Sequence, residues 1–191
     1  VYAAETDYGS ELEALDWADV QSGGLASPYS LTATPDVHEF DPFPSPDGSA
    51  LMYTETRTAA AVATRRTVEG RQAQQGRIAV LDLNAWTTRT MTDAGSYGYG
   101  EWTADGDWLI FTDLNAGEIA ARPADQPGAP TTVAAPEGSG QAFLYPTAAP
   151  DSAWIAYSVY APDEESGAAV WSIGMRNLET NGSGAISGPS G

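Results

Sequence analysis

The chain has 191 residues, with 26 acidic side chains against eight basic ones, all of them arginine, and a net charge of −18. This charge argues against nucleic acid or an anionic membrane surface as a partner, because both repel a strongly acidic protein. Cysteine is absent, which excludes disulfides and thiolate metal sites, whereas 42% apolar residues are enough to build a buried core.

The first residues lack the signature of a targeting segment. "VYAAETDYGS" has neither the basic nor the apolar region of a signal peptide, although the remnant left after cleavage would look the same. No apolar run reaches the length of a transmembrane helix, so we expect no membrane insertion. The next stretch, "ELEALDWAD" from Glu11, resembles "RIAVLDLNA" from Arg77, so the chain is expected to begin in the outer half of a repeat.

Three hairpin motifs follow, and they align without a gap. They are "SPDGSALMYT" from Ser45, "TADGDWLIFT" from Thr103 and "APDSAWIAYS" from Ala149. In each motif an aspartate precedes an apolar residue by four positions and an aromatic residue by six, as in a half-buried strand. Asp-Gly is a favoured two-residue hairpin connection, so each copy predicts a strand, a tight turn and a second strand. The aspartates in register are Asp47, Asp105 and Asp151.

Further strands extend each hairpin motif into a larger unit. Third strands are predicted in "RIAVLDLN", "GEIAARPAD" and "AVWSIGMRN", and fourth strands in "TTRTMTDAG" and "PTTVAAPEG". The three aspartates are 58 and 46 residues apart, which lies in or just above the range of propeller blades and solenoid turns. The sequence therefore predicts an all-β fold of four-stranded antiparallel units, about three and a half of them.

Two segments interrupt this pattern. Residues 56–76 hold half of the arginines, and we interpret them either as a projecting hairpin or short helix that contacts an acidic partner, or as a solvated connecting loop. Residues 178–191 are rich in glycine and serine and are expected to form a flexible tail. The predicted organisation is one repeat domain over residues 1–177, with the insertion at 56–76, followed by the tail.

The repeat resembles that of TolB-like β-propellers, which are relatives of the WD-type propellers. The shared pattern is a proline five positions before the aspartate, an aromatic residue three before it, Ser-Pro-Asp-Gly, and then alternating apolar residues. Pro42 and residues 45–48 match this pattern in the first copy. The departures are Pro44 and Ala148 at the aromatic position, Ala104 at the proline position and Ser152 at the glycine position. The resemblance implies a β-propeller or an open propeller segment.

The number of blades raises the question of how the ring closes. Closed propellers have about four to eight blades, and this chain provides about three and a half. An open ring exposes strand edges that pair with other chains. The chain is therefore expected to be a part of a longer propeller, one of several copies that close a ring together, or a small ring with an atypical fourth blade.

Candidate ligand-binding residues lie at the start of two units. In "GSYGYGEW" the glycines let the backbone bend, and Tyr97 and Tyr99 beside Glu101 offer rigid contact area, although packing between blades would also explain the tyrosines. In "VHEFDPFP" the single histidine, His38, lies near Asp41 at the entry to the innermost strand of a blade. In propellers, this position often lines a central channel. Histidine beside carboxylates has the chemistry of a metal ligand or a base, and an ordinary polar loop residue is the alternative.

No catalytic constellation is complete in the sequence. No Gly-x-Ser-x-Gly motif presents a serine nucleophile, and a zinc site made of several histidines or cysteines is excluded within one chain. The repeated aspartates differ from the sialidase Asp box, because glycine directly follows the first two of them, and they lack the longer ligand series of a calcium loop. We interpret them as turn residues and expect no catalytic residue, metal site or cofactor.

Two functions are compatible with these residues. The first is a non-enzymatic binding or assembly module that recognises a protein or a glycan through its loop face. The second is the propeller portion of an enzyme, either a prolyl oligopeptidase-like peptidase, with its triad in a separate domain, or a propeller-type glycoside hydrolase or lyase. We expect an extracytoplasmic location, and the acidity fits either a halophilic source or an ordinary solvated surface.

Overall fold

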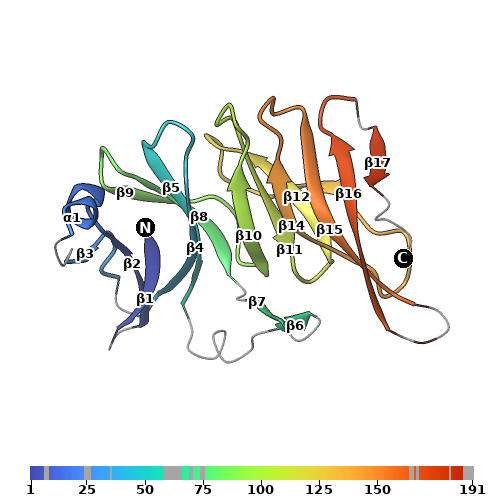
Figure 1. Cartoon of the computed structure of the whole chain (residues 1–191), viewed down its shortest axis with the longest axis horizontal. Coiled ribbons are helices and arrows are strands. Elements are labelled where there is room, and N and C mark those ends of the chain that lie inside the picture. The colour runs from blue at the N-terminus through green and yellow to red at the C-terminus, as the bar shows by residue number, and fades with distance from the viewer. Residues whose placement is uncertain are drawn as a thin grey trace.

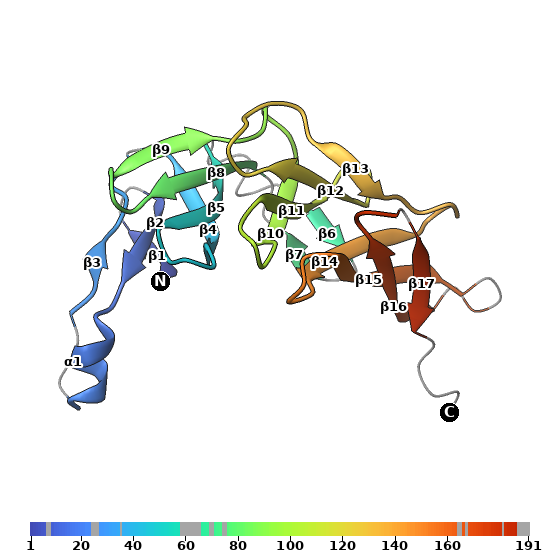
Figure 2. The same cartoon turned by 90° about the horizontal axis from the view of Figure 1, so that it is seen from above.

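The chain forms a row of antiparallel sheets, which we number as blades 1 to 4 from the N-terminus. Four sheets stand side by side along the molecule (Figure 1), and the view from above shows that they follow an open arc (Figure 2). The prediction of an all-β, open propeller segment built from four-stranded antiparallel blades is confirmed. The structure, a computed structural model, describes residues 1–6, 9–23, 27–34, 36–57, 66–68, 71–73, 76–163, 166, 168–180 and 182–186.

Blade 1 has three strands and carries a short helix after its second strand. Its elements are β1 (Tyr2–Thr6), β2 (Gly9–Ala14), α1 (Trp17–Gln21) and β3 (Tyr29–Ser30). Asp16 caps the helix, because its Oδ1 accepts a hydrogen bond of 2.8 Å from the Ala18 N–H. The sequence indicated only the outer half of a blade here, and β1 adds a strand that pairs with β2. Within the described ranges no helix has the length and apolar character needed to cross a membrane.

Blades 2, 3 and 4 each have four strands that follow one another across the sheet in chain order. Blade 2 consists of β4 (His38–Pro44), β5 (Ala50–Thr56), β8 (Arg77–Asp82) and β9 (Thr87–Thr90). Blade 3 consists of β10 (Tyr97–Trp102), β11 (Trp108–Asp113), β12 (Glu118–Pro123) and β13 (Thr131–Ala134). Blade 4 consists of β14 (Ala142–Ala148), β15 (Trp154–Pro162), β16 (Ala169–Asn177) and β17 (Ser183–Ile186). Part of the segment expected to be a tail thus supplies the last strand of blade 4.

The insertion leaves blade 2 intact. It contains a two-stranded hairpin of β6 (Arg66–Val68) and β7 (Arg71–Ala73). On either side of it β5 and β8 remain paired in continuous register, down to Glu55 opposite Arg77. The expected contact with an acidic partner rests on four arginines of this segment, of which Arg65 lies outside the described residues. The four are Arg57, Arg65, Arg66 and Arg71.

In blades 2 and 3 both faces of the second strand are buried, and alternate residues pack against different neighbouring blades. In β5, Leu51 and Tyr53 pack toward blade 1, whereas Met52 packs toward blade 3. In β11, Phe111 belongs to the layer shared with blade 2 and Ile110 to the layer shared with blade 4. Because successive side chains of a strand point to opposite faces, a continuous apolar run supplies two inter-blade cores at once.

The turn of blade 2 is held by its aspartate, as predicted. The Oδ1 of Asp47 accepts hydrogen bonds from the Ser45 hydroxyl (2.6 Å), the Ser49 N–H (3.0 Å) and the Ser49 hydroxyl (2.8 Å). These bonds, with that from Ser45 foremost, lower the pKa of Asp47 to about 2. Gly48 follows at φ 71°, in the left-handed region that favours glycine. The aspartate therefore has a structural role in the corner.

The same turn recurs in blades 3 and 4 with variations. The Oδ1 of Asp105 accepts from the Thr103 hydroxyl (2.6 Å) and from the N–H two residues on (3.0 Å). The Oδ1 of Asp151 accepts from the Ala153 N–H (3.0 Å). Ser152 takes the glycine position at φ 57°, and its Oγ accepts a hydrogen bond of 2.9 Å from the Asp105 N–H. Ser152 thus has a strained backbone conformation, and its side chain forms a hydrogen bond between blades 3 and 4.

The number of hydrogen bonds that each turn aspartate accepts predicts how much stability is lost when it is replaced by alanine. We expect Asp105→Ala to lower the melting temperature by about 2–4 °C, by analogy with the loss of a side-chain cap. Asp47→Ala should cost more, because three donors lose their acceptor, and Asp151→Ala should cost less. Differential scanning calorimetry of the three variants tests this order. Equal melting temperatures in all three would show that these hydrogen bonds do not hold the turns.

Candidate ligand-binding surface on the inner strands

The first strand of each complete blade contains a β-bulge at the same place. The register shifts between Phe40 and Phe43 in β4, and at the equivalent steps of β10 and β14. Within each bulge, the residue six positions before the turn aspartate has a left-handed backbone. These residues are Asp41 (φ 50°), Tyr99 (φ 53°) and Tyr145 (φ 53°). Such a conformation costs roughly 1–2 kcal/mol for a residue other than glycine, and strain of this kind is often found at functional sites.

The bulges bring side chains of neighbouring blades together along the inner side of the arc. The rings of Tyr99 and Tyr145 lie with their centroids 4.3 Å apart and their planes tilted by 50°. Leu114 and Leu144 form the buried layer against which this pair packs. On the other side, the Asp41 carboxylate accepts a hydrogen bond from the Tyr99 N–H. The three strained residues therefore form a continuous row across blades 2, 3 and 4.

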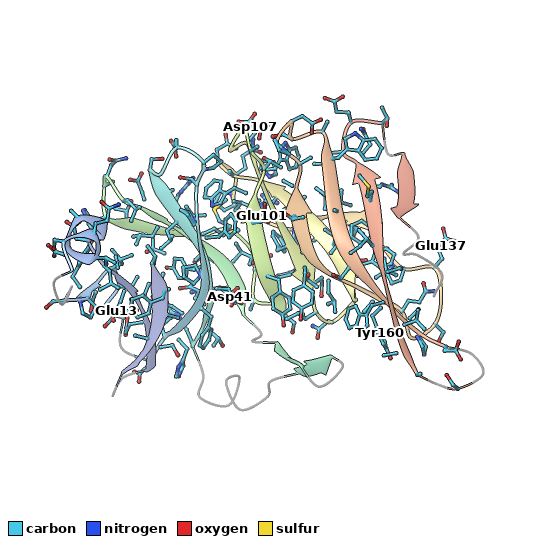
Figure 3. The ribbon with its side chains drawn as sticks, viewed as in Figure 1. Glu13, Asp41, Glu101, Asp107, Glu137 and Tyr160 are labelled. Carbon is cyan, nitrogen blue, oxygen red and sulfur yellow. The ribbon has the colours of Figure 1, made fainter. Side chains whose placement is uncertain are left out.

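The surface along this row carries two carboxylates, that of Asp41 in the row and that of Glu101 beside it. Figure 3 places Asp41 and Glu101 near the middle of the molecule, on β4 and β10. The Oε1 of Glu101 accepts hydrogen bonds from the Thr147 hydroxyl (3.2 Å) and from the Ala148 N–H (3.3 Å) of β14. Desolvation of the Asp41 carboxyl by the surrounding chain raises its pKa, and the hydrogen bond from the Tyr99 N–H partly offsets this increase. The surface thus combines aromatic rings, hydroxyl groups and carboxylates.

The remaining predicted site residues lie elsewhere. The Nδ1 of His38 accepts a hydrogen bond of 3.3 Å from the Ser10 N–H, and its ring lies parallel to that of Phe40. His38 is therefore placed at the contact of blades 1 and 2. The ring of Tyr97 meets Phe111 edge to face at 5.3 Å and packs against the core between blades 2 and 3. The structure brings together Asp41, Tyr99 and Glu101, but neither His38 nor Tyr97 joins them.

Tyr145 and Thr147 belong to this surface and were missed in the sequence. A signal was present, because Tyr145 precedes Asp151 by the same six positions that separate Tyr99 from Asp105. The following residue also marks the bulge, since it is proline or glycine in all three copies. These residues are Pro42, Gly100 and Pro146.

A second group of carboxylates is buried between blades 1 and 2. Glu39 of β4 is 1% exposed, and its Oε2 accepts hydrogen bonds from the Thr32 hydroxyl and from the Leu12 N–H (3.3 Å). The Oε2 of Glu11 accepts from the same hydroxyl at 3.2 Å. Burial raises the pKa of Glu39 to about 7. Across the described part of the chain, no three histidine or carboxylate side chains are grouped so as to hold a metal ion.

Similarity to solved structures agrees with this architecture. A structure described as TolB from Agrobacterium tumefaciens superposes on 96% of this chain with a TM-score of 0.63 and 15% identity, and the chain spans 58% of it. The fold is that of a TolB-like β-propeller. This chain also matches an oligogalacturonate lyase solved with manganese, with a TM-score of 0.63 and 13% identity, over 93% of this chain and 47% of that one.

An enzyme of a different class contains the same fold. A puromycin-hydrolyzing peptidase of Mycobacterium tuberculosis matches 97% of this chain, with a TM-score of 0.61 and 18% identity, and this chain spans 28% of that one. No protein-family model and no curated protein matches this chain. At these low identities the similarity shows the fold alone.

Proposed function

We propose that this chain is a propeller module that binds a protein or a glycan, and that the inner-strand surface around Tyr99 is its contact site. The observation that carries this proposal is the row of three left-handed residues, Asp41, Tyr99 and Tyr145, at equivalent bulges. A single left-handed residue would be a local irregularity. Here the equivalent residue of three blades has the same strained backbone conformation, and the three lie along one surface. The extracytoplasmic location expected in the sequence analysis belongs to the same proposal.

The chemistry of this surface supports recognition of another molecule. Tyr99 and Tyr145 are half-buried, so their rings are fixed by packing while part of each remains open to solvent. Tyrosine offers a large contact area at low cost in side-chain entropy. Asp41, Glu101 and Thr147 add hydrogen-bonding groups beside the rings, which suits either the backbone of a peptide or the hydroxyl groups of a sugar.

The alternative is that the chain is the propeller portion of an enzyme. The solved structures with this fold include a lyase and a peptidase, and the segment spans only part of each. In that case the inner surface would guide a substrate toward catalytic groups located elsewhere. A binding role remains our first proposal, because the inner surface joins packed aromatic rings to carboxylates that accept hydrogen bonds.

Site-specific photo-crosslinking tests the proposed contact site. A benzophenone amino acid in place of Tyr99 should crosslink the partner in an extract of the native cell, because its ring lies at the inner surface. The matched control carries the same group in place of Tyr29, which is 52% exposed on blade 1. Mass spectrometry identifies the captured protein, and a glycan array read with the unmodified chain covers a carbohydrate ligand.

The possible outcomes separate the two functions. A partner captured at position 99 and absent at position 29 supports the binding role. Equal capture at both positions, together with a blank glycan array, would contradict it. Turnover of a peptide or polysaccharide substrate by the chain alone would favour the enzyme instead.

A further inference from the structure

Two buried carboxyl groups meet at one hydroxyl group in the contact between blades 1 and 2. Glu39 of β4 is 1% exposed and Glu11 of β2 is 6% exposed, and we call them the carboxyl pair. The Oε2 atom of each lies within hydrogen-bond distance of the Thr32 hydroxyl, in the connection between β3 and β4. Beside the pair, Leu12 of β2 packs into a buried apolar layer of blade 2. The members of this layer from blade 2 are Leu51, Tyr53, Ala79 and Leu81.

The geometry around Thr32 requires a proton on one member of the carboxyl pair. The hydroxyl has a single hydrogen, and its oxygen accepts the Leu12 N–H at 3.0 Å. It can therefore donate to only one carboxyl, and the other carboxyl must donate to it, which a carboxyl does only when protonated. With one proton on the pair, both contacts of the hydroxyl with carboxyl oxygens are hydrogen bonds. Without it, one contact joins two oxygens that have no hydrogen between them.

The charged groups around the carboxyl pair do not neutralise it. Glu55 of β5 lies opposite Glu39, and Arg77 of β8 forms an ion pair of 2.5 Å with Glu55. Within the described residues, no arginine is ion-paired with either member of the pair. Burial, together with the charges of Glu11 and Glu55, raises the pKa of Glu39 to about 7. The titratable groups near the pair are Tyr53 and Glu55 of β5, Arg77 of β8 and His38 of β4.

We propose that one proton shared by Glu11 and Glu39 makes the contact of blade 1 with blade 2 sensitive to pH. When this proton is lost to solvent, two buried negative charges on different blades repel each other, and the contact weakens. An exposed carboxyl ionises at the ordinary pKa of 4.5, so the contact weakens as the pH rises from 4.5 to about 7 and levels off above that. Blade 1 stands at one end of the row (Figure 1), so it can loosen while blades 2 to 4 stay together.

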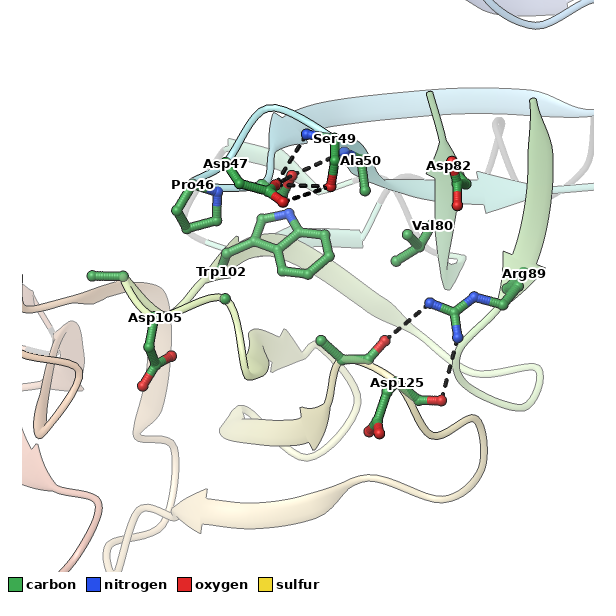
Figure 4. Close-up of a pocket in the computed structure, with 14 residues that line it drawn as sticks. Pro46, Asp47, Ser49, Ala50, Val80, Asp82, Arg89, Trp102, Asp105 and Asp125 are labelled. Carbon is green, nitrogen blue, oxygen red and sulfur yellow. Dashed lines mark hydrogen bonds between the residues drawn. The ribbon is translucent and has the colours of Figure 1, made fainter. Parts of the chain in front are cut away.

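The contact between blades 2 and 3 is built differently and serves as the internal comparison. The Nε1 of Trp102 donates to the carbonyl of Phe43 at 3.1 Å. The two terminal nitrogens of Arg89 donate to the carbonyls of Ala124 (3.3 Å) and Asp125 (3.2 Å), as Figure 4 shows. An indole and a guanidinium keep their protons throughout this range of pH. These cross-blade bonds are therefore expected not to change when the carboxyl pair titrates.

Thiol labelling measures how often each contact opens. The chain has no cysteine, so Ala79→Cys places a single thiol in the layer facing blade 1, and Ala120→Cys places one between blades 2 and 3. Dithiodipyridine reacts with either thiol once its layer opens, and the same variant in urea gives the rate for an exposed thiol at each pH. Relative to that rate, labelling of Ala79→Cys should rise at least about tenfold from pH 5.5 to pH 8. Ala120→Cys should react more slowly at both values.

Replacement of either carboxyl shows whether the proton is shared. In the Ala79→Cys background, Glu39→Gln should abolish the rise with pH, and Glu11→Gln should reduce it at least about twofold, because one of the two charges is gone. The matched control is Glu13→Gln, which neutralises a carboxylate of the same strand outside the pair and should keep the rise.

Three outcomes would overturn the proposal. Equal labelling at positions 79 and 120 at every pH would show that the whole chain unfolds as one unit. An unchanged rise in Glu11→Gln would show that Glu39 titrates alone. Labelling of Ala79→Cys that does not depend on pH, relative to the exposed thiol, would show that the contact has no such sensitivity.

Discussion

Replacement of Glu39 by glutamine is expected to raise the free energy of unfolding at pH 8 by about 2 kcal/mol, with an upper bound of about 3 kcal/mol. Burial raises the pKa of this carboxyl from its ordinary value of 4.5 to about 7, and the charges of Glu11 and Glu55 add to the effect. The hydrogen bonds from Thr32 and the Leu12 N–H act in the opposite direction. Relaxation of the surrounding structure around an ionised carboxylate removes part of the cost, so the expected value lies below the bound.

The direction of this pH dependence follows from the number of protons that the folded and unfolded states bind. Between pH 4.5 and 7 the folded protein keeps a proton on Glu39 that the unfolded chain has lost, so its stability falls as the pH rises and levels off above pH 7. Glu39→Gln carries no charge at any pH, and its amide oxygen can accept the same hydrogen bonds. The two proteins should therefore be equally stable at pH 4 and should differ most at pH 8.

Urea unfolding at pH 4, 5.5, 7 and 8 measures this difference. The control is Glu137→Gln, which neutralises an exposed carboxylate outside the cluster and should leave the pH dependence unchanged. A stability difference between the native protein and Glu39→Gln that is the same at every pH would show that folding does not shift the pKa of Glu39. No difference at pH 8 would show that its burial has no cost.

The isolated chain is expected to self-associate through the outer face of blade 4, and Ile173→Lys should weaken this association at least about tenfold. Blade 4 stands at one end of the row (Figure 1). Tyr157 points toward blade 3, so the alternate residues of β15 and their partners in β16 face the other way. On that face the rings of Tyr160 and Trp171 lie 5.5 Å apart, and Trp171 and Ile173 are 41% and 42% exposed.

Light scattering over a range of concentrations and salt tests this association. An apolar contact should persist at high salt, whereas a contact between charged groups should weaken. The control is Trp86→Lys, which adds the same charge at an apolar side chain that is 58% exposed in the turn between β8 and β9. If the unmodified chain were a compact monomer at all concentrations, blade 4 would not be an association surface.

The blades could be predicted because the patterns that define their strands and turns lie within short stretches of the sequence. An aspartate turn followed by alternating apolar residues defines each hairpin, and three copies in register exclude coincidence. The third strands followed from their apolar runs, since strands buried on both faces carry such runs. The first strand of blade 1, Tyr2–Thr6, was harder to predict, because "YAAET" has neither a repeated turn before it nor an apolar run.

The candidate surface was only partly predictable, because it depends on contacts between blades. Tyr97 and Tyr99 are alike in sequence, yet the bulge turns one toward the core and the other toward Tyr145. The environment of Glu39 was missed as well. It lies eight positions before its turn aspartate, where the other two blades place the core aromatics Tyr97 and Phe143, so the aligned repeats contained this signal.

The insertion in blade 2 has a practical consequence for engineering. Its two ends leave the sheet from β5 and β8, which are adjacent and paired through Glu55 and Arg77, so the connection closes over a short distance. A foreign domain with neighbouring termini could replace residues 58–75 without separating these strands. We expect such a chimera to keep the melting transition of the blades, which calorimetry can follow. The loop would then serve as a display position on a rigid all-β carrier.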